Sequence, residues 1–118
     1  MSILIVDDNP DITDLLSKFL KSKGYENIVA NNSTEGLEKI LNENFDYVFL
    51  DIHMPELSGL DIIKKLEEKR KLENLKIVIF SAHNFSPQQI EELMNKDGIH
   101  GYLKKPIQLN RLLASITN

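Results

Sequence analysis

Five short apolar runs, each followed by a longer segment of helical periodicity, set the strongest limit on how this chain can fold. Three of the runs are continuous rather than alternating, which is typical of strands buried on both faces of a sheet. The pattern therefore predicts five strands that alternate with helices. The runs are Ile3–Val6, Ile28–Ala30, Tyr47–Leu50, Ile77–Phe80 and Tyr102–Leu103.

Between the runs, apolar residues recur three or four positions apart, as on one face of a helix. Asn9-Pro10 is suited to begin the first helix and Gly24 to end it. Ser33/Thr34 and Ser86-Pro87 are suited to begin the second and fourth helices. The apolar faces are Ile12, Leu15, Leu16, Phe19 and Leu20; Leu37, Ile40 and Leu41; Leu60, Ile63 and Leu66; Ile90, Leu93 and Met94; and Leu109, Leu112, Leu113 and Ile116.

This order predicts an α/β fold of the (βα)5 type, because right-handed crossovers place helices on both faces of a parallel sheet. The chain has 118 residues, which is the size of one domain. The pattern favours the order 2-1-3-4-5 for five strands, but composition alone leaves the strand order open.

Composition excludes several classes of function. The net charge of −4 provides no general attraction to nucleic acid or to an anionic membrane. The absence of cysteine excludes disulfides, thiolate metal sites and cysteine nucleophiles. No segment reads as a signal peptide or as a membrane span, so we expect a cytoplasmic protein.

Polar residues follow the predicted strands at the edge where parallel α/β sheets bind their ligands. Asp7 and Asp8 follow the first strand, Asp51 the third, Ser81 the fourth and Lys105 the fifth. Each of them alone could be an ordinary loop or helix-capping residue. Their convergence from four separate segments favours a binding site instead.

The chemistry of these groups favours phosphoryl transfer. Three neighbouring carboxylates repel one another unless a cation joins them, and their oxygens suit Mg²⁺, or Mn²⁺ in its place. An ammonium and a hydroxyl then suit a phosphoryl group, which a carboxylate can accept as an aspartyl phosphate. No nucleotide-binding G-x-x-x-x-G-K-[ST] loop is present, and the acidic loop after the first strand would repel the phosphate of a flavin mononucleotide.

These motifs resemble the receiver domains of two-component response regulators of the chemotaxis-regulator type. The resemblance covers essentially the whole chain. It implies a flavodoxin-like doubly wound sheet of order 2-1-3-4-5 with five flanking helices, in a single receiver domain over residues 1–118 without an output domain. The motifs that carry it are Val6-Asp7-Asp8, Leu50-Asp51-Ile52-His53-Met54-Pro55 with Gly59, Phe80-Ser81-Ala82 and Tyr102-Leu103-Lys104-Lys105-Pro106.

The resemblance also implies the role of each site residue. Asp51 would accept a phosphoryl group from a phosphohistidine on a sensor histidine kinase or a histidine phosphotransfer protein. Asp8, Asp51 and the backbone carbonyl of His53 would bind the metal, and Asp7 would hold it through water. Lys105 would pair with the phosphoryl oxygens.

The signal would then travel through two further residues. Ser81 would be the switch hydroxyl that bonds to the phosphoryl group, and Tyr102 would turn inward when Ser81 moves. The face built from the fourth helix, the fifth strand and the fifth helix would change and bind a downstream protein partner. The Lys105-Pro106 bond is expected to be cis, which would aim the ammonium into the site.

Other interpretations remain open at this point. His53 and His83 would border the phosphoryl group and set its lifetime, or both are exposed loop residues without effect. The fold could serve as a pseudo-receiver, a binding module that phosphorylation does not regulate, although such modules lose the acids or the lysine that this chain keeps. An aspartyl-phosphate enzyme usually has an acid two residues after its nucleophile, where this chain has His53, so we do not expect an enzyme. His100 is expected to precede the fifth strand as a surface residue.

Overall fold

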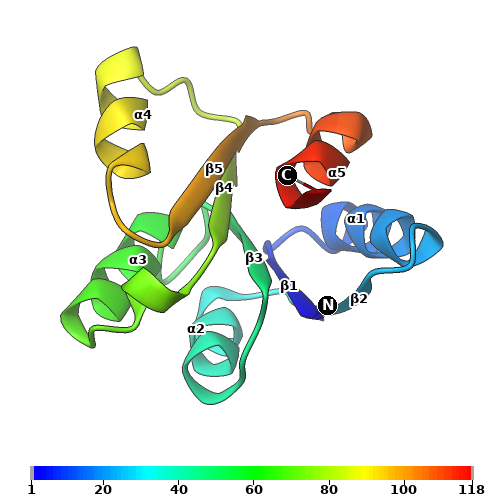
Figure 1. Ribbon diagram of the computed structural model, residues 1–118, viewed down its shortest axis with the longest axis horizontal. Coiled ribbons are helices and arrows are strands. Elements are labelled where there is room, and N and C mark those ends of the chain that lie inside the picture. The colour runs from blue at the N-terminus through cyan, green and yellow to red at the C-terminus, as the bar shows by residue number, and fades with distance from the viewer. Residues whose placement is uncertain (1, 118) are drawn as a thin grey trace.

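The computed structural model describes residues 2–117 and shows a parallel sheet between two layers of helices (Figure 1). The strands are β1 (Ser2–Val6), β2 (Glu26–Ala30), β3 (Tyr47–Asp51), β4 (Ile77–Ser81) and β5 (Ile99–Lys104). The helices are α1 (Pro10–Ser22), α2 (Ser33–Asn42), α3 (Gly59–Glu68), α4 (Pro87–Met94) and α5 (Leu109–Thr117), with a short 3₁₀ helix at Leu72–Asn74. The strand order β2-β1-β3-β4-β5 confirms the flavodoxin-like (βα)5 prediction.

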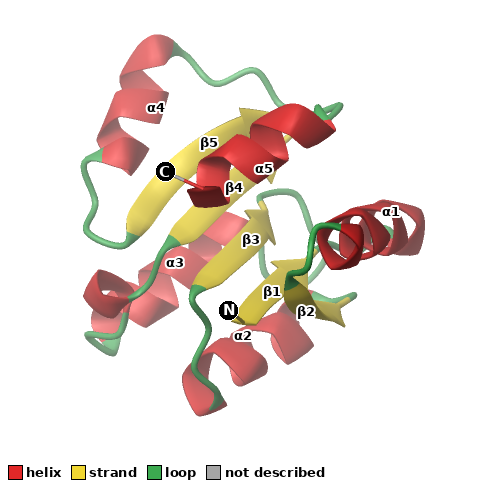
Figure 2. Cartoon of the chain, turned by 45° about the vertical axis from the view of Figure 1, so that its right-hand side comes forward, coloured by secondary structure: helices red, strands yellow, loops and turns green. Residues whose placement is uncertain are grey.

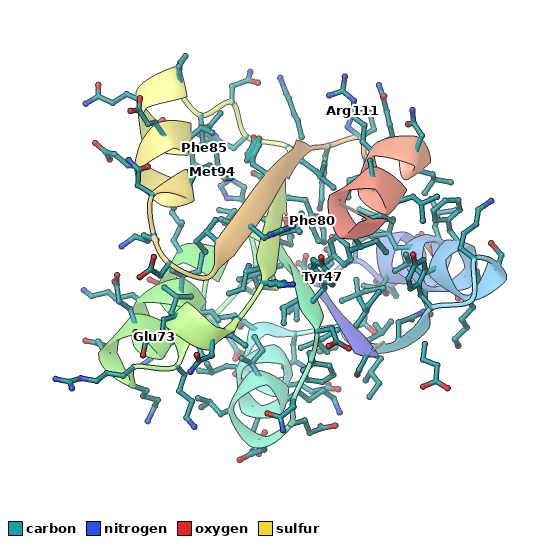
Figure 3. The ribbon with its side chains drawn as sticks, viewed as in Figure 1. Tyr47, Glu73, Phe80, Phe85, Met94 and Arg111 are labelled. Carbon is teal, nitrogen blue, oxygen red and sulfur yellow. The ribbon has the colours of Figure 1, made fainter. Side chains whose placement is uncertain are left out.

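Helices cover both faces of the sheet, so the central strands are buried on both sides (Figure 2). α1 and α5 pack on one face against alternate residues of the strands, and Figure 3 shows Tyr47 and Phe80 in this layer. α2, α3 and α4 pack on the other face. This explains why the runs at β1, β3 and β4 are apolar without alternation.

The predicted helix starts are confirmed at α1 and α4. The Asn9 side chain accepts a hydrogen bond from the Asp11 amide, and Pro10 is the first helical residue. Ser86 forms a capping box at the start of α4. The start of α2 differs, because Asn32 is its cap and Ser33 is already helical. The Ser33 hydroxyl instead bonds to a distant loop.

The fifth strand is longer than predicted, and the placement of His100 before it is wrong. Ile77 pairs with Ile99 but Val78 pairs with Gly101, so His100 is an extra residue in β5 that forms a bulge. The bulge interrupts the alternation that would have identified the strand. The His100 ring is exposed as expected, and it contacts the ring of Tyr47 edge to face at 5.4 Å between centroids.

α4 is the least buried helix of the fold. None of its residues is buried, whereas every helix from α1 to α3 buries at least three. Just after α4, the Lys96 ammonium pairs with the Glu67 carboxylate of α3 at 3.0 Å. None of the helices within residues 2–117 is long and apolar enough to cross a membrane.

Arg70 occupies a backbone position that favours glycine. Its φ is +55°, and it follows α3, where the Arg70 amide bonds to the Glu67 carbonyl and the Lys71 amide bonds to the Leu66 carbonyl. This is a Schellman ending with arginine in the left-handed position. We expect Arg70→Gly to raise the free energy of unfolding by about 1 kcal/mol, because glycine adopts this φ without steric cost. Urea unfolding followed by circular dichroism measures the change.

Arg70→Ala is the matched control, because it removes the same side chain and keeps the steric cost at positive φ. It should leave the free energy of unfolding near that of the parent. An equal gain from alanine and glycine would show that the arginine side chain, and not the backbone, is responsible.

Candidate metal centre

Three carboxylates meet at the carboxyl end of the sheet. Asp7 and Asp8 directly follow β1, and Asp51 ends β3, which is the neighbour of β1 in the sheet. One carboxylate oxygen from each lies within 4.8 Å of the other two. Asp7 and Asp51 are buried, whereas Asp8 is exposed. The predicted convergence is therefore present, and the acidic cluster opens to solvent at Asp8.

Lys105 reaches this cluster from the loop after β5. Its ammonium lies 2.9 Å from an Asp7 carboxylate oxygen and 3.3 Å from an Asp51 carboxylate oxygen. It also lies over the Phe80 ring, 5.3 Å from the centroid. The Lys105-Pro106 bond is cis, as the resemblance implied. The Lys105 ammonium thus forms ion pairs with two buried carboxylates.

Asp7 is held by protein groups at each of its oxygens. One carboxylate oxygen accepts the Asn9 amide at 2.9 Å, and the other accepts Lys105. The Asp7 main-chain carbonyl accepts the Asn31 side chain, which also donates to the Thr13 hydroxyl at 2.8 Å. Sequence reasoning missed Asn31. Its only signal was its place directly after a strand, where asparagine usually marks a turn.

The environment of Asp51 disfavours its charge. Burial raises the pKa of Asp51, the neighbouring Asp7 carboxylate raises it further, and Lys105 and the His53 amide lower it, with a result of about 6. Burial alone would lower the pKa of Lys105, but its hydrogen bond to Asp7 and the charges of Asp51 and Asp7 raise it overall. The lysine therefore stays charged, and the acids retain an excess of negative charge that a divalent cation would neutralise.

The remaining predicted residues are linked to one another by hydrogen bonds and ring contacts. Ser81 is fully buried at the end of β4, and its hydroxyl accepts the His83 amide at 3.0 Å. The Tyr102 hydroxyl donates to the His83 carbonyl at 3.3 Å. The rings of His53 and His83 contact each other edge to face at 5.4 Å. A row of ring contacts continues from His83 through Phe85 to Tyr102.

The raised pKa of Asp51 predicts a pH-dependent loss of stability in the metal-free protein. The unfolded carboxyl, with a pKa near 3.8, ionises before the folded one, with a pKa of about 6. Stability therefore falls as pH rises through this interval, and the loss is complete above it. We expect Asp51→Asn to raise the free energy of unfolding by about 1–3 kcal/mol at neutral pH and not at about pH 4. Urea unfolding with a chelator present measures it.

Asp61 provides a control of opposite sign. Hydrogen bonds from Ser58 lower the pKa of Asp61, so its charge stabilises the fold above the unfolded pKa and this contribution is lost as pH falls. Asp61→Asn should therefore lose stability at neutral pH, where Asp51→Asn gains it. A gain at neutral pH from both variants would contradict the assignment of the penalty to Asp51.

Comparison with known proteins identifies the family. The family model of the response regulator receiver domain matches residues 3–117. The polar-differentiation response regulator DivK of Brucella anthropi is 30% identical over 115 residues, which cover 98% of this chain and 92% of DivK. The CpxR homolog of Haemophilus influenzae, a transcriptional regulatory protein, is 34% identical over 97% of this chain, but the match spans 48% of that protein.

Solved structures agree with the sequence comparison. The response regulator TrrA of Thermotoga maritima, in complex with Mg²⁺-BeF, has a TM-score of 0.81 at 32% identity over 98% of this chain and 95% of TrrA. A CheY-like receiver domain protein of Methanospirillum hungatei has a TM-score of 0.83 at 32% identity over 98% of this chain and 89% of that chain. The acidic cluster, the strand order and these matches together show that this chain belongs to the response regulator receiver domain family of two-component signalling.

Proposed function

We propose that this receiver domain accepts a phosphoryl group on Asp51 and thereby acts as a switch in a phosphorelay. The observation that carries the proposal is the shared contact of Lys105 with Asp7 and Asp51 beside the exposed Asp8. Such a centre has a nucleophilic carboxylate, a fixed positive charge and an open acidic ligand. These are the requirements for phosphoryl transfer by positioning and charge neutralisation.

The residues present fit a divalent cation. Asp8 and Asp51 would be direct ligands together with the backbone carbonyl of His53, and Asp7 would act through water. Oxygen donors of this kind suit Mg²⁺ or Mn²⁺. When bound, the cation supplies positive charge that favours the ionised form of Asp51. The likeness to TrrA, which is solved with Mg²⁺-BeF, supports this assignment.

The proposed transfer is a substitution at phosphorus. An oxygen of the Asp51 carboxylate attacks the phosphorus of a phosphohistidine, the P–O bond forms, and the P–N bond breaks in line with it. The histidine of the donor leaves with the electron pair of that bond. Lys105 already lies 3.3 Å from Asp51, so its ammonium is placed to stabilise the transferred oxygens.

The donor is proposed to be a sensor histidine kinase or a histidine phosphotransfer protein. An apolar cavity borders the Lys105 side of the centre, and Leu15 of α1 beside it is 56% exposed. This surface fits the apolar side of a donor helix. The cavity is lined by Ile12, Leu15, Leu16, Ala82, Lys105, Pro106 and Ile107.

We also propose that the chain acts in the cytoplasm without direct binding to nucleic acid or membrane. The net charge of −4 supports this proposal, because it provides no general attraction to either partner.

The output is proposed to be the face formed by α4, β5 and α5. A phosphoryl group adds about −1.5 to −2 charge and three acceptor oxygens next to Ser81 and Lys105. The hydroxyl of Tyr102 on β5 already bonds to the loop that follows Ser81. A shift of that loop would change the position of Tyr102 and bias this face between two states, of which a downstream protein partner binds one.

A small phosphodonor tests the proposal. Incubation of the protein with acetyl phosphate and Mg²⁺ should add one phosphoryl group, seen as a mass increase of the intact protein. Asp51→Asn should abolish the adduct, because the amide is not a nucleophile. Asp46→Asn is the matched control, because Asp46 binds the Ser2 amide at the opposite end of β3, and it should leave the adduct unchanged.

The alternatives give different results in the same experiment. No adduct under these conditions would support the pseudo-receiver, a binding module that phosphorylation does not regulate. Rapid repeated turnover of the donor would support an aspartyl-phosphate enzyme. A stable adduct that persists in Asp51→Asn would place the acceptor elsewhere and contradict the proposal.

The lifetime of the phosphoryl group should depend on His53 and His83. Both rings are exposed and contact each other, and they follow Asp51 and Ser81 by two residues, so we expect them to obstruct an attacking water. We expect the double variant His53→Ala/His83→Ala to lose the phosphoryl group several times faster than the parent, as measured by intact mass after removal of the donor. His100→Ala, an exposed histidine on β5, should keep the parent rate. An unchanged rate in the double variant would refute this role.

A further inference from the structure

The loop between β3 and α3 contains a strained turn. The Leu57 amide bonds to the Pro55 carbonyl at 2.9 Å, which closes a three-residue turn around Glu56. Glu56 has a φ of +70°, a conformation that costs a residue with a side chain about 1 kcal/mol or more. Such a turn persists only where its surroundings hold it.

The first turn of α2 contacts every residue of this strained turn. The Ser33 hydroxyl donates to the Pro55 carbonyl at 3.0 Å and accepts the Leu57 amide at 3.2 Å. Next to it, the Thr34 hydroxyl donates to the Glu56 carboxylate at 3.1 Å. Ser33 is 1% exposed, so water does not compete for its hydroxyl.

The same loop carries the proposed carbonyl ligand of the metal centre. At its start, the Ile52 amide bonds to the Phe80 carbonyl and the Ile52 carbonyl accepts the Gly59 amide at 2.8 Å. His53 therefore lies between two fixed points, which are Ile52 at one end and the turn held by Ser33 at the other. Free movement of either end would move the His53 carbonyl.

We propose that Ser33 is a positioning residue, whose buried hydroxyl fixes the Pro55–Leu57 turn and so holds the His53 carbonyl in place for a divalent cation. The inference rests on the proposed function, since it requires the His53 carbonyl to be a ligand. The Pro55 carbonyl and the Leu57 amide already bond to each other. The Pro55 carbonyl and the Leu57 amide would therefore keep a hydrogen-bond partner without the Ser33 hydroxyl. Loss of this hydroxyl is expected to change the geometry of the loop more than the number of its hydrogen bonds.

Ser33→Ala tests the proposal through metal affinity. The variant should fold, because alanine fits the space and no main-chain group of the turn loses its last partner. Binding of Mn²⁺, followed by the electron paramagnetic resonance signal of the free ion, should show a dissociation constant about tenfold higher than in the parent. The rate of phosphorylation by acetyl phosphate should fall at low Mg²⁺ and recover at saturating Mg²⁺.

Ser17→Ala is the matched control. The Ser17 hydroxyl is also buried in a helix and bonds to the Asn27 side chain, far from the loop along the chain. Its loss should lower stability without changing the dissociation constant for Mn²⁺. Thr34→Val removes only the exposed bond to Glu56, so it should raise the dissociation constant less than Ser33→Ala. If Ser33→Ala is poorly folded, Thr34→Val still tests whether the contacts of α2 with the Pro55–Leu57 turn affect metal affinity.

The outcomes separate this inference from the proposed function. If the parent binds Mn²⁺ and is phosphorylated on Asp51 while Ser33→Ala and Thr34→Val bind Mn²⁺ as tightly, the positioning role is wrong and the proposed function stands. A parent that binds no Mn²⁺ refutes both. A rate that stays low at saturating Mg²⁺ in Ser33→Ala, with a similar fall in Ser17→Ala, would reveal a general structural effect and overturn the role of Ser33.

Discussion

The contact of one ammonium with two buried carboxylates determines the arrangement of the carboxyl end of the sheet. Asp7 directly follows β1 and Asp51 ends the neighbouring strand β3, and in a medium of low dielectric their charges repel. Lys105 offsets this repulsion from the loop that follows β5. Removal of the ammonium would leave buried charges without compensation, which is among the more costly changes in a protein interior. The loops after β1, β3 and β5 are therefore tied together by charge as well as by packing.

The parallel sheet makes this contact possible because it presents separate loops side by side. Asp51 ends a strand that is buried along its whole length, and a slip in register would exchange the side chains that pack into the two cores. Gly59 at the start of α3 packs so closely against the Asp51 carbonyl that a side chain there would collide with it. The backbone of Asp51 is thus held by the strand and by the helix that follows.

Much of this arrangement follows from the sequence alone, because a regular apolar pattern determines where each strand ends. The ends of the strands then determine which polar residues meet, so Asp8, Asp51 and Lys105 could be placed together in advance. Three features could not be predicted in this way. They are the bulge at His100, the hydrogen bond from Asn31 to Asp7, and the hydrogen bonds of Ser33 to the Pro55–Leu57 turn. The bulge depends on how β5 pairs with β4, and the two sets of hydrogen bonds depend on how segments far apart in the sequence approach in space. A local sequence pattern carries no information on such an approach.

The absence of buried residues from α4 has a consequence for the energetics of signalling. A helix that contributes little to either apolar core can be displaced with little loss of hydrophobic stabilisation. Coupling between sites in proteins is commonly about 1–3 kcal/mol, which would not suffice to pull a well-buried helix out of its packing. Under the proposed function, the free energy needed to displace α4 would therefore fall within the range that an added phosphoryl group can supply.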